Sequence, residues 1–327
     1  MNPRDAPLAA LLVVTWSSGF VGAELGTRTA SSHAVLAWRF VVAALVLGAV
    51  VLVRAQRVSR AAVRRQIGLG VVMQCLYLGG IYTGVQYGVS AGLSALIAAL
   101  QPMVVAALAA AFLAQRIGGR TAAGLLLGIV GVAVVVGGNL GGDAPWWAYA
   151  LTVGGTVSLS VGTLLQSRNS EPVPITVGLA VQSATAAVFF LAWSLAAGDA
   201  LPPADGGFWF AVGWTVVLST FLAIGSYFVV IGRRGATAAS ALLYLTPPVT
   251  MIWGWAMFGD RLGLATVPGL ALCAVAVALV LRAPTAAPTR PTRPRPAGRS
   301  EGSSGATPAP PRPDHAPSCR AVSTTAD

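Results

Sequence analysis

Lysine is absent from the 327-residue chain, and charged residues of all kinds make up only 9% of it. Soluble domains carry about a quarter charged residues, because their surfaces face water. Hydrophobic residues fill 55% of the positions, and the mean hydropathy is +0.74. A chain of this length with so few charges cannot cover itself with a water-soluble surface, so its surroundings must be mostly lipid.

Cysteine and histidine are also scarce: the cysteines are Cys75, Cys273 and Cys319, and the histidines are His33 and His315. Their spacing matches neither a metal-ligand set nor a disulfide framework. The sequence also lacks an ATP-binding motif, paired carboxylates within its apolar runs, and a nucleophile with a nearby base. We therefore expect no metal and no cofactor. The same observations argue against the rival interpretation of a membrane-embedded enzyme.

The formal net charge is +11, and arginine supplies every basic side chain. A strongly basic chain can indicate nucleic-acid binding, but these arginines lie in short segments between apolar runs. That distribution is typical of the positive-inside rule of membrane proteins. The expected partners are a small-molecule substrate and the lipid bilayer, with no nucleic acid, and the sequence leaves the oligomeric state open.

Ten apolar runs are long enough to cross a bilayer, which takes roughly 20 helical residues. The first run could imitate a signal peptide, but similar runs recur as far as residue 282, so we interpret it as a membrane helix. The uncharged stretch from Gln66 to Gln115 fits two helices, with a turn near Gly88, Ser90 and Gly92. The predicted fold is an all-α integral membrane protein with ten transmembrane helices, at residues 6–23, 33–53, two within 66–115, 121–138, 146–166, 174–196, 207–231, 235–258 and 263–281.

Arginines in the connections predict the orientation of these helices. With the N-terminus inside, twelve arginines fall in inner segments and only Arg28 and Arg261 fall in outer loops. We therefore expect a multi-pass protein of the cell (inner) membrane with both termini in the cytoplasm.

Residues 283–327 differ in character from the rest of the chain. They are rich in proline, alanine, serine, threonine and arginine, and cannot bury a core. We expect a disordered cytoplasmic tail. Two interpretations stay open: contact with anionic lipid or a partner protein, and a solvated tail without an essential role.

The two halves of the apolar region repeat each other at an offset of 145 residues. Matching pairs are Pro102 with Pro247, Arg116 with Arg261, Thr121 with Thr266, and Gly124 with Gly269. A repeat unit of five helices reverses the orientation of the second half in the membrane. Such inverted repeats are typical of transporters whose substrate site lies between the repeats near mid-membrane. We place the first repeat at residues 1–138 and the second at residues 139–282.

The repeated runs resemble a known family. The segments that carry the likeness read "SAGLSALIAALQPMVV" and "GATAASALLYLTPPVT", preceded by "TWSSGFVGAEL" in the first helix and "LAWRF" in the second. Over residues 6–282 the chain resembles the EamA-type exporters, the ten-helix members of the drug/metabolite transporter superfamily. The resemblance implies export of amino-acid-like metabolites or drugs, and it puts Arg39 at the family's arginine position.

The chain departs from that family pattern at three positions. The family usually has glutamate near the ends of the fourth and ninth helices, where this chain has Gln115 and Asp260. Toward the end of the first helix many relatives have lysine, whereas this chain has Glu24. The coupling mechanism and substrate of a relative therefore do not transfer directly.

Arg39 is the only charged side chain inside a predicted span, and Glu24 directly follows the first span, at a similar outer depth. An arginine roughly 9 Å into a helix is expensive in lipid unless it faces a cavity or a partner. We predict that Arg39 pairs with Glu24, either as an anion anchor or gate, or as a structural pair that fixes the first two helices. Glu24 is also the first candidate for proton coupling or gating, although a positive partner would oppose proton uptake.

Polar and aromatic side chains within the spans should face the interior of the bundle, since amides and hydroxyls need partners in lipid. Each one alone is more often a packing contact than a ligand. Pro102 and Pro247 interrupt the helical hydrogen bonding and are candidate hinges, with static kinks as the alternative. The candidate substrate-binding residues are Trp16, Arg39, Gln74, Tyr77, Gln101, Tyr227, Tyr244 and Trp253.

These observations favour a secondary transporter that exports small amphiphilic or zwitterionic metabolites, or drugs, by alternating access. The low charge of the spans argues against a highly charged substrate such as a nucleotide sugar. The alternatives are an importer of small metabolites and a membrane scaffold or accessory protein, for which the proline-rich tail is the one hint.

Overall fold

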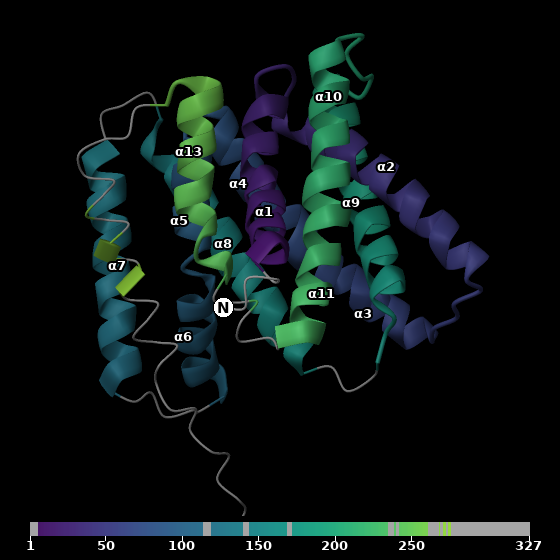
Figure 1. Cartoon of the computed structure of the whole chain (residues 1–327). Coiled ribbons are helices and arrows are strands. Elements are labelled where there is room, and N and C mark those ends of the chain that lie inside the picture. The colour runs from purple at the N-terminus through teal and green to yellow at the C-terminus, as the bar shows by residue number, and fades with distance from the viewer. Residues whose placement is uncertain are drawn as a thin grey trace, which may run out of the picture. The chain divides into compact units, whose positions relative to one another are not determined.

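The structure is a computed structural model that describes residues 6–113, 119–139, 144–168, 172–234 and 242–260, with 239, 268, 271, 272, 274 and 275. Every regular element in this part of the chain is a helix (Figure 1). In chain order the elements are α1 Ala6–Thr27, α2 Ser32–Val53, α3 Arg60–Gly70, η2 Val71–Leu76, α4 Tyr77–Gln86, α5 Ala91–Ala98, α6 Gln101–Leu113, α7 Gly119–Asn139, α8 Trp146–Ser167, α9 Ile175–Ala197, α10 Gly206–Trp214, η3 Thr215–Leu222, α11 Ala223–Arg234 and α13 Thr246–Phe258.

Seven helical segments of the described residues are long and apolar enough to cross a membrane, and they coincide with seven of the predicted spans. Of the other three, 121–138 falls within α7 and 235–258 contains α13, whereas 263–281 lies mostly outside the described residues. The tail, Gln115, Arg116 and Arg261 also lie outside them. The seven segments are Ala6–Thr27, Ser32–Val53, Arg60–Gln86, Ala91–Phe112, Trp146–Ser167, Ile175–Ala197 and Gly206–Arg233.

The predicted turn inside the long uncharged stretch is confirmed. Helix α4 ends at Gln86, and Gly88 follows with a φ of +98°, a left-handed conformation that favours glycine. Ser90 then caps α5 by accepting a hydrogen bond from the backbone N–H of Leu93 at 3.3 Å. These local signals split the stretch into two helices.

Two of the long segments contain a π-helical stretch, η2 and η3. A π turn displaces backbone carbonyls from their usual partners, and side chains take up two of them here. Ser158 of α8 donates to the carbonyl of Val72 at 2.8 Å, and Thr220 donates to the carbonyl of Thr215 at 3.2 Å. Shifted by the repeat offset of 145, η2 falls at 216–221, inside η3.

Two further interruptions follow the same offset. Helix α5 stops at Ala98, and α6 starts at Gln101, one residue before Pro102. In the second half a turn at residues 244–245 precedes α13, which starts at Thr246 with proline at its first positions. Pro247 therefore begins a helix in the structure, whereas the sequence analysis put it inside one. Proline lacks an N–H, so the first helical turn is where it costs least.

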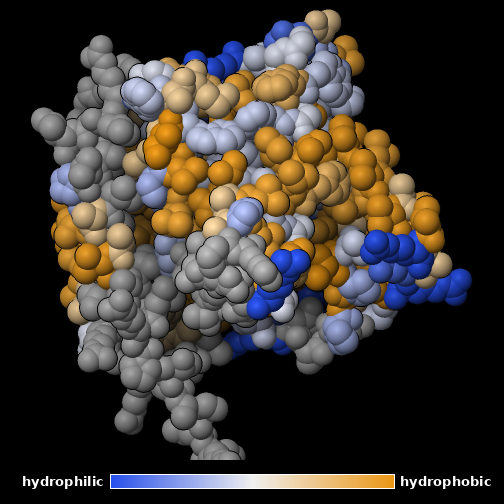
Figure 2. Space-filling model, in the orientation of Figure 1, coloured by the Kyte–Doolittle hydropathy of each residue, from blue (hydrophilic) through white to orange (hydrophobic). Residues whose placement is uncertain are grey.

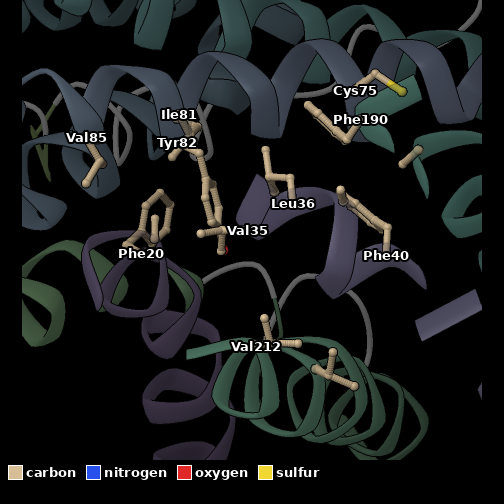
Figure 3. Packing of buried hydrophobic residues seen from close by; sticks show 14 of the residues in the cluster. Phe20, Val35, Leu36, Phe40, Cys75, Ile81, Tyr82, Val85, Phe190 and Val212 are labelled. Atoms are coloured by element: carbon tan, nitrogen blue, oxygen red, sulfur yellow. The ribbon is translucent and has the colours of Figure 1, made fainter. Parts of the chain in front are cut away.

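The core lies where α1, α2, α4, α9 and α10 meet (Figures 1 and 3). Helix α2 packs along α9, and the rings of Phe40 and Phe190 stack with centroids 6.0 Å apart. Tyr82 of α4 is fully buried in the same cluster, beside Val35 and Phe20. This packing fixes α2 and α4 relative to α1, and with them the side chains described below.

Helix contacts depend on small residues, as is usual in membrane proteins. A Cβ at Gly80 would meet the carbonyl oxygen of Leu151 at 2.5 Å, so only glycine lets α4 approach α8 this closely. The outward faces are apolar instead: Leu52, Val53 and Trp146 are among the exposed side chains. Figure 2 shows hydrophobic side chains across much of one face, with hydrophilic ones toward its upper and lower right edges.

Candidate functional site

The interrupted helices surround a cavity of about 450 Å³. This volume is in the range of small-molecule sites, which are mostly apolar with a few placed polar groups. The apolar lining includes Phe20, Met73, Val105 and Leu159. The polar and amphipathic lining residues are Trp16, Gln74, Tyr77, Gln101, Thr163, Tyr227, Tyr244 and Thr246.

Side-chain contacts hold part of this lining in place. Gln101 Nε2 donates to Thr163 Oγ1 at 2.9 Å, which connects α6 to α8. Gln74 Nε2 donates to Gln182 Oε1 at 3.2 Å, which connects η2 to α9. Both amides keep hydrogen-bonding capacity beyond these bonds.

Aromatic side chains supply the rest of the amphipathic wall. The rings of Trp16 and Tyr227 lie 5.4 Å apart and tilted, which joins α1 to α11. The hydroxyl of Tyr244, in the turn before α13, is buried and has no hydrogen-bond partner among the described residues. An unsatisfied buried hydroxyl is costly, so this group is available to a bound molecule.

A second, smaller cavity of about 170 Å³ adjoins the first, since both are lined by Trp16, Phe20, Gln74 and Tyr77. Its distinctive residue is Arg39 of α2, which is only 6% exposed. Arg39 Nη1 donates to Tyr82 Oη at 2.7 Å, and Nη2 lies 3.3 Å from Ser219 Oγ and 3.5 Å from Thr220 Oγ1. Hydroxyls, rather than carboxylates, therefore surround this guanidinium.

The predicted Arg39–Glu24 pair is wrong. Glu24 of α1 forms an ion pair with Arg28, one helical turn further along, at 2.8 Å. The other oxygen of Glu24 accepts from the backbone N–H of Ala91 at 3.2 Å, at the start of α5. The arginine distribution assigned Arg28 to an outer loop, although i,i+4 spacing on a helix brings such pairs together. Glu24 therefore pairs with Arg28, the arginine nearer to it along the chain, and not with Arg39 of α2.

Glu24 and Arg28 form part of what we call the end cluster, with Phe258 and Asp260 at the C-terminal end of α13. The guanidinium carbon of Arg28 lies 4.4 Å from the centre of the Phe258 ring, a cation–π contact. Asp260 follows Gly259, whose φ of +73° ends α13. Burial raises the pKa of the Asp260 carboxyl, and the positive charge of Arg28 opposes that rise.

A separate polar contact ties α2 to the loop after α9. His33 Nε2 lies 2.9 Å from a carboxylate oxygen of Asp199, and its ring stacks on Trp193 at 5.2 Å. Ser31 also donates to Asp199. Gly198, with a φ of +81°, turns the chain so that Asp199 reaches this position.

The structure brings together most of the candidate substrate-binding residues. The larger cavity is lined by Trp16, Gln74, Tyr77, Gln101, Tyr227 and Tyr244, together with the candidate hinge Pro102, and Arg39 lines the smaller one. Trp253 lies elsewhere: its ring packs against Trp214 at 5.4 Å, and it lines neither cavity. The candidate hinge Pro247 is buried next to the cavity-lining Thr246.

Ser219 and Thr220 are site residues that the sequence analysis missed, because single hydroxyls in an apolar run carry little signal. The repeat offset could have identified Ser219. Adding 145 to Gln74 gives Ser219, and adding it to Tyr82 gives Tyr227. All four of these residues line one or both cavities.

Comparisons with known proteins agree with this architecture. A family model described as the EamA-like transporter family matches the chain twice, over residues 6–137 and 146–282. The uncharacterized inner membrane transporter YedA of Escherichia coli K12 is 30% identical over 161 residues, which are 48% of this chain and 51% of that protein. The uncharacterized transporter YvbV of Bacillus subtilis 168 is 26% identical over 171 residues, 48% of this chain and 52% of that protein.

The chain thus spans about half the length of the curated relatives it matches. A solved crystal structure of another protein is similar over 85% of this chain and 96% of that chain, with a TM-score of 0.56 and 20% sequence identity. That likeness concerns the fold alone. The apolar helices and the inner-membrane relatives together indicate a multi-pass inner-membrane protein.

Proposed function

This chain belongs to the EamA-like transporter family, and from that premise we propose that it is a secondary transporter that exports small amphiphilic or zwitterionic metabolites, amino-acid-like, or drugs, by alternating access. The two adjoining cavities give this proposal its main support, because residues of both halves of the chain line them. Gln74 and Gln101 come from the first half, and Ser219 and Tyr227 from the second. Sites between two repeats are typical of secondary transporters.

The proposed topology has ten helices in two inverted five-helix repeats, at residues 1–138 and 139–282, with both termini in the cytoplasm. The interruptions of the helices support the repeat, because η2 and η3 follow the 145-residue offset, as do the breaks before α6 and α13. Broken helices near mid-membrane are a common feature of transporter sites. The arginine distribution supports the orientation.

In that orientation the larger cavity extends toward the cytoplasm. Its lining includes Thr163 near the end of α8 and Tyr227 in α11, two helices that would run inward in this orientation. The end cluster would then lie at the outer side, where Glu24 connects α1 to the start of α5 and Arg28 contacts α13. We therefore propose that the end cluster closes the outer gate in this conformation, and that Pro102 and Pro247 act as hinges.

A plug in the larger cavity tests the proposed function. Ala98 of α5 lines this cavity, so Ala98→Trp should fill part of it and stop transport. Leu45 of α2 is 69% exposed on the apolar surface, so Leu45→Trp adds the same side chain away from the cavity.

Spent media from cells that express the wild type, Ala98→Trp or Leu45→Trp, at matched membrane levels, should be compared by untargeted metabolite analysis. A set of metabolites enriched by the wild type and Leu45→Trp, but not by Ala98→Trp, would support export. Metabolites depleted in the same pattern would favour import. Identical media, together with unchanged drug resistance and uptake, would refute a transport function and favour an accessory role.

A further inference from the structure

The Arg39 guanidinium has an uneven set of hydrogen bonds. Nη1 makes one short bond, to the buried hydroxyl of Tyr82 at 2.7 Å. Nη2 makes long contacts of 3.3 and 3.5 Å to Ser219 and Thr220, and Nε is buried with no acceptor among the described residues. One edge of the guanidinium is thus anchored while the other, formed by Nε and Nη2, is nearly unused.

This buried charge also lacks a counter-charge in the described part of the chain. Four acidic residues are described, Glu24, Asp199, Asp205 and Asp260, and none of them lines either cavity. Neither of the two ion pairs among the described residues involves Arg39. An arginine keeps its charge, and an uncompensated charge at this depth is costly in a membrane protein. The free energy of the protein therefore favours a bound anion here.

The shape of the free edge selects the kind of anion. Nε–H and one Nη2–H point the same way in the guanidinium plane, and this fork matches the two oxygens of a carboxylate. Ser219 Oγ lies beside Nη2, and it donates its hydroxyl proton to no described residue. It can therefore add a third hydrogen bond to the same carboxylate.

The volume and the lining of the cavities beside Arg39 limit the size and polarity of the rest of the ligand. The space next to Arg39 is about 170 Å³ and shares Trp16 and Tyr77 with the larger cavity, which Tyr227 also lines. These rings suit a flat or apolar body. Among the described residues, no acid that could bind an ammonium group lines either cavity.

We propose that the substrate is an organic monocarboxylate with an aromatic or apolar body, whose carboxylate binds the Nε–Nη2 edge of Arg39 and the Ser219 hydroxyl while its body lies among Trp16, Tyr77 and Tyr227. This proposal rests on the proposed function and narrows its substrate class. An amino group is not required, because an ammonium would find only ring faces and neutral oxygens in the lining.

A series of phenyl compounds tests the charge requirement on the purified full-length wild type. Phenylacetate, phenylacetamide, phenethylamine and phenylalanine share a ring and differ in charge, and ligand-dependent thermal unfolding gives their affinities. A charge-assisted pair of hydrogen bonds predicts that phenylacetate binds roughly ten- to hundredfold more tightly than the amide. Phenylalanine should bind no more tightly than phenylacetate, and chloride at equal ionic strength should not reproduce the stabilisation.

Variants then assign the preference to Arg39. In Arg39→Gln the acid and the amide should bind equally, and in Arg39→Lys the preference should be partial, because lysine keeps the charge but lacks the fork. Arg168→Gln, which removes an exposed arginine at the end of α8, should retain the full preference. If Arg39→Gln does not fold, the ligand series on the wild type and Arg39→Lys still decides.

Several outcomes would overturn the proposal: equal binding of phenylacetate and phenylacetamide, tenfold tighter binding of phenylalanine, equal stabilisation by chloride, no binding by any compound, or a preference that survives in Arg39→Gln. The proposed function fails by a different result, the identical media described above. If Ala98→Trp abolishes export but phenylacetate and phenylacetamide bind equally, the proposed transport function is supported and only the carboxylate site is refuted.

Discussion

Arg28 and Arg39 are both arginines of the helical region, and the contrast between their surroundings separates two roles. Arg28 has its acid, Glu24, at 2.8 Å and an aromatic ring at 4.4 Å, and its side chain is 54% exposed. Arg39 is 6% exposed, its hydrogen-bond partners are all hydroxyls, and the rings of Phe40 and Tyr82 lie 5.5 and 5.8 Å from its guanidinium carbon. A satisfied and half-exposed charge holds helices together, whereas a buried charge without a counter-ion is suited to binding.

The two arginines also connect different sets of helices. Around Arg28, contacts join the ends of α1, α5 and α13. Around Arg39, they join α2 and α4 to the π-helical segment η3, which follows η2 at the repeat offset. We therefore expect substitutions near Arg28 to shift the balance of conformations, and substitutions near Arg39 to remove affinity.

The largest loss of transport is expected on substitution of Arg39. With phenylacetate as the probe in proteoliposome counterflow, Arg39→Gln should lower the transport rate roughly ten- to hundredfold, through loss of charge-assisted hydrogen bonds. Arg28→Gln should lower it by about fivefold at most, because an exposed ion pair contributes no more than about 1 kcal/mol. Equal losses in the two variants would show that the contrast between the two arginines has no functional meaning.

A smaller effect is expected where α1 passes Ser219. A Cβ at Gly19 would lie 2.8 Å from Ser219 Oγ, so Gly19→Ala must displace the hydroxyl that accompanies Arg39. Overpacking of this kind costs about 1–3 kcal/mol, and we expect phenylacetate affinity to fall by roughly tenfold. Gly48→Ala is the matched control, since nothing lies within 4 Å of a Cβ there. Unchanged affinity in Gly19→Ala would mean that Ser219 does not contact the ligand.

Accessibility from outside should report on the end cluster. Glu24→Gln removes the charge and keeps a single acceptor oxygen, so either Arg28 or the N–H of Ala91 loses its partner, and the outer closure should weaken by about fivefold. A cysteine at Ala95, which lines the larger cavity, measures this opening in a cysteine-free background. A membrane-impermeant thiol reagent should label Ala95→Cys several-fold faster when Glu24→Gln is present.

The control for this labelling is Leu201→Cys, at a residue that is 87% exposed beyond α9. Its labelling rate should not depend on residue 24. If the Ala95→Cys rate is also unaffected, Glu24 holds α1 and α5 together without acting as a gate.

Much of this architecture could be predicted from the sequence, because hydrophobic length and turn signals are local. Seven spans and the turn at Gly88 are read from residues close together in the chain. The site prediction rested on a weaker rule, that polar side chains in lipid face the interior. Residues such as Gln74, Gln101 and Tyr244 follow this rule, since they line the cavity. It failed for Trp253, because an aromatic residue can pack against another ring, here Trp214, away from the cavity.

The pairing of charges could not be predicted, because it depends on which helix faces are turned toward each other. Arg28 and Arg39 were both expected at about the same depth in the membrane as Glu24. Arg28, which directly follows α1, forms the pair. The hydroxyls around Arg39 come from Tyr82 and from η3, 180 residues away for Ser219. The π-helical segments are equally invisible in a hydropathy pattern.

The smallest effect concerns the pH dependence of Asp260, which borders the Arg28 side of the comparison. Burial raises the pKa of this carboxyl above its value in the unfolded chain, so the folded protein binds the proton more tightly. Stability therefore falls as pH rises from about 4 through the raised pKa. Asp260→Asn cannot ionise and should escape this loss.

Relative to the wild type, the apparent melting temperature of Asp260→Asn should rise by about 1 °C between pH 4 and pH 7.5. The effect is small because Asp260 is only partly buried. Comparing the variant with the wild type at each pH cancels the titration of other groups. A difference of the opposite sign would mean that attraction to Arg28 outweighs burial. Asp260 would then be an ionised second partner of Arg28, and the end cluster would hold α1 against α13 by charge as well as by the Phe258 ring.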